Sequence, residues 1–271
     1  AERAAAAKTF AAAELAPADD LAARAAAALA DGNPAAASRL ARDARWNLPF
    51  LPPDLPPHVG RVLGVSRLRH ADRVNALAYS PDGGRVASAS RDGTVRVWDV
   101  GNGREIVAYR GHAGPEAGDE KTNVLRVPAV AFSPDGKAVA STGGKEVHVW
   151  DAATGTKAKT LAGHAAPVRG LAFGTDPNTL FTGGDDRKVI VWDVAAGKPT
   201  HTFPDQAQRV ESVAVGGKGK LLATLNAAGE LYVYHLADRR ILLSVPVTDG
   251  GQAGYGVAFA GDGLVTCGGD S

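Results

Sequence analysis

The chain has 271 residues with 30 Lys and Arg against 29 Asp and Glu, and it holds no run of about 18 uninterrupted apolar residues. This charge balance provides no field for phosphate groups, so nucleic acid is not an expected partner, and no segment is expected to span a membrane. The single cysteine, Cys267, excludes an intrachain disulfide framework and a zinc site with several cysteine ligands. We expect neither a cofactor nor a bound metal.

Residues 1–45 are rich in alanine and carry helix signals. Asp19-Asp20 is expected to begin a helix that ends near Ala30, with Gly32 in the left-handed position after it. Asn33-Pro34 supplies an N-cap and a first-turn proline for a helix through Arg45. One face of the earlier helix holds Leu21, Ala25 and Leu29. The pattern predicts a helical hairpin; a helical docking module is the alternative.

Residues 46–59 contain five prolines and no helical or strand period. Because proline fixes φ and keeps the preceding residue extended, this segment is predicted to be a stiff connector between the helices and the rest of the chain. A ligand for a proline-recognising domain is the alternative interpretation.

From about residue 60 onward the sequence repeats itself. Each unit contains short β-branched runs separated by turn signals such as Ser-Pro-Asp-Gly, which predicts four short strands per unit. Such units must stack on one another to bury both faces. The aligned segments are AYSPDGGRVASASRDGTVRVWDV (78–100), AFSPDGKAVASTGGKEVHVWDA (131–152), AFGTDPNTLFTGGDDRKVIVWDV (172–194), AVGGKGKLLATLNAAGELYVYHL (214–236) and AFAGDGLVTCGGDS (258–271).

Two dipeptides recur in these units. Gly-His precedes the first strand at 111–112 and 163–164, and Trp-Asp ends the third strand at 98–99, 150–151 and 192–193. The chain thereby resembles the WD-repeat β-propeller family, and within it the bacterial WD-repeat domain-containing proteins. The resemblance implies an all-β propeller of four full repeats and part of a fifth, preceded by a short α-helical segment. The expected domains are the helical segment 1–45, the connector 46–59 and the propeller 60–271.

The resemblance also implies a buried hydrogen-bond network in each repeat, made of a His, a Ser or Thr, a turn Asp and the Trp. The second repeat lacks the Asp, and the fourth keeps only Thr224, with Gln206, Ala228 and Tyr234 at the other positions, so its blade is expected to be weaker. The same residue types form hydrolase triads, but here they recur in each repeat without a G-x-S-x-G elbow. The implied network residues are His70, Ser88, Asp92 and Trp98; His112, Ser141 and Trp150; and His164, Thr182, Asp186 and Trp192.

The ends of the repeat region predict an incomplete ring. Residues 60–69 match a fourth strand that would complete the last blade, while the fifth unit stops at Ser271 after its second strand. With no methionine in the sequence, we expect a fragment of a longer protein, either exported or cytoplasmic; a five-bladed ring is the alternative. An open arc exposes sheet edges, which favours self-association through the incomplete blade.

By analogy with the family, ligands are expected on the face that follows each repeat histidine. Several arginines there favour an acidic or carboxylate-bearing protein or peptide ligand, although solvated surface is an alternative. A polar insertion at 113–125 is a second candidate. We expect a non-catalytic binding scaffold; the alternatives are a sensor or regulatory module of a larger enzyme or exported protein and, least favoured, a propeller hydrolase or oxidoreductase. The candidate binding residues are Arg73, Asn75, Arg91, Arg126, Pro128, Pro167, Arg169, Asp185, Arg209 and Glu211.

Overall fold

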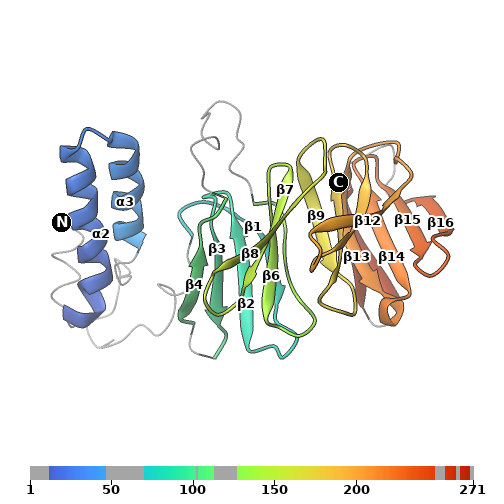
Figure 1. Ribbon diagram of the computed structural model, residues 1–271, viewed down its shortest axis with the longest axis horizontal. Coiled ribbons are helices and arrows are strands. Elements are labelled where there is room, and N and C mark those ends of the chain that lie inside the picture. Colours follow the sequence, from blue (N-terminus) through green and yellow to red (C-terminus); the bar gives the residue numbers. More distant parts are fainter. Residues whose placement is uncertain are drawn as a thin grey trace, which may run out of the picture. The chain divides into compact units, whose positions relative to one another are not determined.

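The computed structural model describes residues 12–46, 70–101, 103–112, 127–247, 254–260 and 263–268 (Figure 1). The chain forms two compact units, Ala1–Asp72 and Arg73–Ser271. The proline-rich connector beyond Trp46, the strand expected at 60–69, Arg126 and the insertion at 113–125 lie outside the described residues. Within those residues, no helix is long and apolar enough to cross a membrane.

The described residues of the first unit form two helices that pack on each other, α2 (Ala12–Ala30) and α3 (Pro34–Trp46). Gly32 has φ of 72°, and the Asn33 side chain accepts a hydrogen bond from the Ala36 N–H at 3.0 Å, so the turn between the helices is built as expected. The prediction that Asp19-Asp20 starts a helix was wrong: α2 begins seven residues earlier, because alanine favours helix strongly enough to include both aspartates. On the face that holds Leu21, Ala25 and Leu29, Ala25 is buried and Leu29 is exposed.

Where the structure describes it, the second unit consists of four four-stranded antiparallel sheets and one two-stranded sheet, each formed from consecutive strands. A short 3₁₀ turn, η2 (Gly217–Gly219), precedes β14. The strands are β1 (Val74–Tyr79), β2 (Arg85–Ser90), β3 (Val95–Asp99) and β4 (Glu105–Tyr109) in the first sheet; β5 (Val130–Phe132), β6 (Ala138–Gly143), β7 (Glu146–Asp151) and β8 (Lys157–Ala162) in the second; β9 (Val168–Phe173), β10 (Thr179–Gly184), β11 (Val189–Asp193) and β12 (Lys198–Phe203) in the third; β13 (Val210–Gly216), β14 (Leu221–Asn226), β15 (Glu230–His235) and β16 (Ile241–Pro246) in the fourth; and β17 (Gly254–Ala260) and β18 (Gly263–Gly268) in the fifth.

The core lies between neighbouring sheets rather than inside any one of them. Trp150 of the second sheet packs with Val95 and Val97 of the first, and Trp192 of the third sheet packs in the same way on the second. The first strand of each sheet contacts the first strand of the next, so the sheets follow one another in space as they do in the chain (Figure 1). The predicted architecture of four complete four-stranded repeats and part of a fifth, preceded in the chain by a short helical segment, is confirmed.

The Trp-Asp pair has a local reason at the end of each third strand. The ladder between the third and fourth strands shifts register at the aromatic residue in all four complete sheets. In the second, third and fourth sheets, this aromatic side chain packs against the preceding sheet. The following aspartate closes the next turn: Asp151 Oδ1 accepts the N–H groups of Ala153 and Thr154 at 3.0 and 2.8 Å.

The turns lie on two edges of the stacked sheets because consecutive strands are antiparallel. One edge, called the rim below, carries the turns between second and third strands and the starts of the first strands. The two are joined by backbone bonds, as from Arg91 N–H to the Arg73 carbonyl at 2.9 Å and from Asp185 N–H to the Pro167 carbonyl at 2.8 Å. The opposite edge carries the turns between first and second and between third and fourth strands.

Candidate functional site

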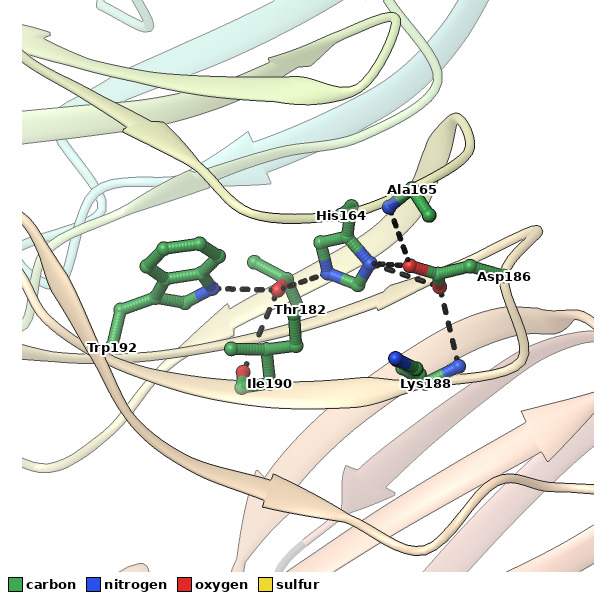
Figure 2. A network of polar contacts seen from close by, with 7 residues as sticks. All are labelled: His164, Ala165, Thr182, Asp186, Lys188, Ile190 and Trp192. Atoms are coloured by element: carbon green, nitrogen blue, oxygen red, sulfur yellow. Dashed lines mark hydrogen bonds and ion pairs between the residues drawn. The ribbon is translucent and has the colours of Figure 1, made fainter.

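A four-residue chain of polar contacts runs through the third sheet and its neighbouring loop (Figure 2). Nδ1 of His164 lies 3.0 and 2.9 Å from the two carboxylate oxygens of Asp186, and its Nε2 lies 2.8 Å from the Thr182 hydroxyl oxygen. The indole N–H of Trp192 donates to the same hydroxyl oxygen at 2.7 Å. The structure thus brings together all four residues that the third repeat was expected to contribute.

The donors and acceptors fix where the protons lie in this chain. Asp186 is an acceptor only, so Nδ1 of His164 carries hydrogen and Nε2 accepts the Thr182 hydroxyl proton. The carboxylate also accepts the backbone N–H groups of Ala165 and Lys188 at 2.9 and 3.2 Å. Burial lowers the pKa of His164 although Asp186 opposes the shift, so the imidazole is neutral at pH 7.

The network resembles a catalytic triad in composition but not in access. The side chain of His164 is 1% exposed and that of Asp186 is 6% exposed, while Thr182 is fully buried. A nucleophilic hydroxyl must reach a substrate, and this one is enclosed between an indole and an imidazole (Figure 2). The arrangement fastens the rim turn to the strands below it.

The first and second sheets contain related contacts. In the first, Trp98 donates its indole N–H to the Ser88 hydroxyl at 2.7 Å, His70 is buried, and Asp92 accepts the backbone N–H and hydroxyl of Thr94 at 2.8 and 2.6 Å. In the second, Ser141 lies 2.7 Å from Nε2 of His112 and accepts the indole N–H of Trp150 at 3.0 Å.

The second sheet replaces the missing aspartate with aromatic rings. His148 stacks on His112 with ring centroids 4.4 Å apart, and its Nδ1 is 2.8 Å from the hydroxyl of Tyr109, which itself stacks on Trp150. Burial, aided by His148 and Lys157, lowers the pKa of His112 to about 3. Burial also lowers the pKa of His148, so both rings are neutral at pH 7 and stack without charge repulsion, while each keeps a hydrogen bond to a hydroxyl group. The sequence signal was His148, at the position filled by Arg96, Ile190 and Tyr232 in the other sheets.

The fourth sheet keeps only Thr224 of the expected residue types, and a different network forms around it. The side-chain amide of Gln206 donates to the Thr224 hydroxyl at 2.6 Å and lies 3.3 Å from the hydroxyl of Tyr234. All three residues are buried. In this sheet no carboxylate is present to fix the tautomer of a histidine. The amide N–H of glutamine donates to the threonine hydroxyl without one, so glutamine can replace histidine here. The tyrosine hydroxyl takes the place of the indole N–H.

The rim carries a chain of ion pairs across the third and fourth sheets. Arg169 donates to Asp185 in the adjoining turn of its own sheet, and its Nη1 lies 3.6 Å from Glu211 of the fourth sheet. Arg209 Nε donates to the same Glu211 at 2.5 Å. Asp185 contributes most to raising the pKa of Arg169. Four of the candidate binding residues therefore form one connected group.

The remaining candidates are distributed along the same edge. Arg73 and Asn75 are exposed and Arg91 is half-exposed. The Asn75 amide donates to the Val127 carbonyl at 3.2 Å and so joins the first sheet to the second. Pro128 is half-exposed and Pro167 exposed.

Arg187, on the same edge, was missed by the sequence analysis. It has φ of 66° where the equivalent rim turns have Gly93, Gly144 and Gly229, and its guanidinium lies 3.7 Å from Asp205. The signal was the replacement of glycine by arginine in that turn. Within the described ranges, no group of three or more His, Cys, Asp or Glu residues could hold a metal ion.

The model of the WD domain, G-beta repeat, matches residues 64–99, 119–151 and 155–193. The chain contains WD40 repeats. Their third-strand Trp-Asp pairs, at 98–99, 150–151 and 192–193, close the three matched segments and end β3, β7 and β11.

Curated proteins similar to this chain include Periodic tryptophan protein 2 of Saccharomyces cerevisiae, 24% identical over 209 residues that cover 63% of this chain and 22% of that protein. Protein Notchless of Drosophila melanogaster is 34% identical over 125 residues, 44% of this chain and 23% of that protein. A U3 snoRNP-associated protein-like protein of Arabidopsis thaliana is 32% identical over 130 residues, 44% of this chain and 27% of that protein. The chain thus spans about a quarter or less of these WD40-repeat relatives' lengths. All three are eukaryotic, so they do not support the resemblance to bacterial members.

Proposed function

We propose that this chain is a non-catalytic scaffold that binds a protein or peptide at its rim. The observation that carries the proposal is the ion-paired group Asp185, Arg169, Glu211 and Arg209, which crosses two sheets on one edge. The buried His164 network holds the adjoining turn in place beneath it. Charged side chains on such a rigid support recognise a ligand with little loss of conformational entropy.

The ligand that fits this rim carries an acidic side chain or a terminal carboxylate. Arg169 is already held by two carboxylates, so it orders the rim rather than capturing the ligand. The side chains of Arg187 and Arg209 are 53% and 47% exposed. In the described part of the chain, the only nitrogen of these two guanidinium groups that donates a hydrogen bond is Nε of Arg209. Their guanidinium groups suit a carboxylate. Among the described residues, the pairing of Arg169, Arg187 and Arg209 with carboxylates reduces the basic surface that nucleic acid could bind.

The names of two relatives support a scaffold role within a larger assembly. The Arabidopsis relative is named as associated with the U3 snoRNP, and a similarly named relative occurs in Oryza sativa. By analogy, this chain would dock one component of a multi-protein complex. A sensor or regulatory module of a larger enzyme or exported protein uses the same surface chemistry and is the second candidate.

The proposal is tested by partner capture with matched charge reversals. The double variant Arg187→Glu and Arg209→Glu changes the rim, while Lys137→Glu with Arg240→Glu makes the same charge change at exposed positions of the opposite edge. We expect proteins that wild-type chain captures from an extract of the source organism to be lost with the rim variant and kept with the control. Equal thermal unfolding of both variants establishes that the fold survives. Recovery of the same proteins by the rim variant would contradict the proposal.

Self-association through the fifth sheet stays a prediction. Tyr255 of β17 and Val265 of β18 are 64% and 56% exposed, which supports an apolar contact with a second copy. Sedimentation velocity over a range of concentrations tests it: a single monomeric species throughout would contradict it.

A further inference from the structure

A cavity lies at the opposite edge of the stacked sheets, between the third and fourth sheets. The cavity is about 270 Å³ in volume, and its floor is formed by Phe181, Val191 and Phe203. Phe181 and Phe203 are buried. Polar groups stand around the floor: Thr175 and Asp176 from the turn after β9, His201 from β12 and Arg239 from the turn after β15.

One sequence difference between the first and third sheets coincides with this space. In the first sheet the equivalent position holds Arg85, whose Nη2 donates to the Gly136 carbonyl of the second sheet at 2.6 Å and whose guanidinium lies 5.4 Å from the ring centre of Phe132. In the third sheet that position is Thr179, which is too short to cross to the next sheet. The space that Arg85 occupies between the first pair of sheets is open between this pair.

Arg239 reaches the cavity from an unusual backbone conformation. Its φ is 59°, while the equivalent turns of the first three sheets hold Gly103, Gly155 and Gly197 at φ of 67° to 71°. A side chain in the left-handed region destabilises the turn relative to glycine. Strain of this kind is retained where the side chain has a role. Here the guanidinium crosses to the third sheet and lies 3.2 Å from Nδ1 of His201.

His201 is placed to orient that guanidinium. Nδ1 accepts the Arg239 N–H, which requires a neutral imidazole, and burial together with Arg239 lowers the pKa of His201. The ring also packs edge-on against Phe203 with centroids 4.8 Å apart, which fixes its orientation. The arginine is thus held over an apolar floor with other N–H donors available to a ligand.

We propose that this cavity binds an α-carboxylate next to a large apolar side chain, as found in a free amino acid or at a peptide C-terminus. Arg239 pairs with the carboxylate, the side chain lies on Phe181 and Phe203, and Asp176 with Thr175 accepts the α-nitrogen donor. A volume of about 270 Å³ admits one residue rather than a folded segment. Asp176 opposes a phosphate dianion but suits a ligand that carries an N–H donor. The site is on the opposite edge from the rim and does not depend on the function proposed for it.

The test measures binding of three probes to the full chain: the tripeptide Gly-Gly-Phe, its C-terminal amide and free phenylalanine. Chemical shifts of the His201 ring, followed by NMR during titration, report occupancy at the site itself. We expect millimolar or tighter binding of the free-acid tripeptide and at least tenfold weaker binding of the amide. Free phenylalanine binding as well as the tripeptide identifies the ligand as an amino acid; tripeptide binding alone identifies a chain terminus.

Two variants test whether the Arg239 side chain is needed for binding of the probes. Arg239→Gly restores the residue found in the other sheets, so we expect at least tenfold weaker binding with Tm unchanged or raised. Arg240→Gly removes the same charge from the next residue of the turn, whose side chain does not line the cavity, and it should bind the probes like wild type. The proposal is overturned if none of the probes shifts His201, if the amide binds as well as the acid, or if Arg239→Gly binds unchanged.

Discussion

Arg169 of the third sheet and Glu211 of the fourth are paired across the boundary between two sheets, with Nη1 and Oε2 3.6 Å apart. Glu211 also accepts from Arg209, and Arg169 also donates to Asp185. The pair therefore connects the first strands of two neighbouring repeats, β9 and β13, at the edge where we place ligand binding.

Replacing Arg169 with Gln should destabilise the chain by about 1 kcal/mol, because the largely buried Glu211 side chain then loses one of its two cationic partners. Arg209→Gln removes a more exposed arginine and should have a smaller effect. Urea unfolding of both variants at low and high salt measures the difference. A larger loss for Arg209→Gln than for Arg169→Gln would contradict the assigned order.

Replacing Asp186 with Ala should destabilise the chain by about 1–3 kcal/mol, because His164 Nδ1–H and the Ala165 N–H lose their buried acceptor. Lys145→Ala, at an exposed position in the corresponding turn of the second sheet, is the control and should change stability little. Asp186→Asn keeps one acceptor oxygen and should recover part of the loss. Equal, small shifts of the denaturation midpoint in the Ala variants would remove the network from the explanation.

His112 should make stability depend on pH. Its pKa is about 3 in the folded chain and 6.5 in an unfolded one, so between these values the unfolded chain binds a proton that the folded chain does not. The free energy of unfolding is therefore highest above pH 6.5 and falls as pH decreases toward 3, by up to about 1.4 kcal/mol per unit.

The matched variant for this effect is His112→Gln, since glutamine fills the same position in the fourth sheet as Gln206. His148 and His164 also have lowered pKa values, so a residual slope should remain in the variant. Chemical denaturation at a series of pH values from 7 to 4 measures the two slopes. Parallel curves for wild type and variant would mean that His112 titrates normally in the folded chain.

Replacing Gln206 with Leu should destabilise the fourth sheet by about 1–3 kcal/mol, because the hydroxyls of Thr224 and Tyr234 stay buried without the amide. The loss should be local. Amide hydrogen exchange of β13 to β16 should accelerate more than that of β5 to β8. Uniform acceleration across the chain would show that the fourth sheet has no separate dependence on Gln206.

The sequence predicted the features that repeat and missed those that occur once. The strands, the turns and the His164 network follow from recurring residue types whose roles are local. By contrast, two contacts join segments that are far apart in the sequence: His148 stacks on His112, and Arg239 contacts His201. The spacing of the repeats does not predict such pairs. The sequence showed that Gln206 replaces the histidine of the other repeats. It did not show that the Tyr234 hydroxyl lies close enough to the Gln206 amide to form part of a buried network. The start of α2 was misjudged because propensity outweighed a local capping signal.

The central claim is that a partner binds the rim, and hydrogen exchange measured by mass spectrometry on a captured complex tests it most directly. We predict that the partner slows exchange in the rim turns at 185–188 and 227–229, while the opposite-edge turns at 133–137 and 236–240 exchange as in the free chain. Protection confined to the opposite edge or to the outer strands β8 and β12, with the rim unchanged, would contradict the account.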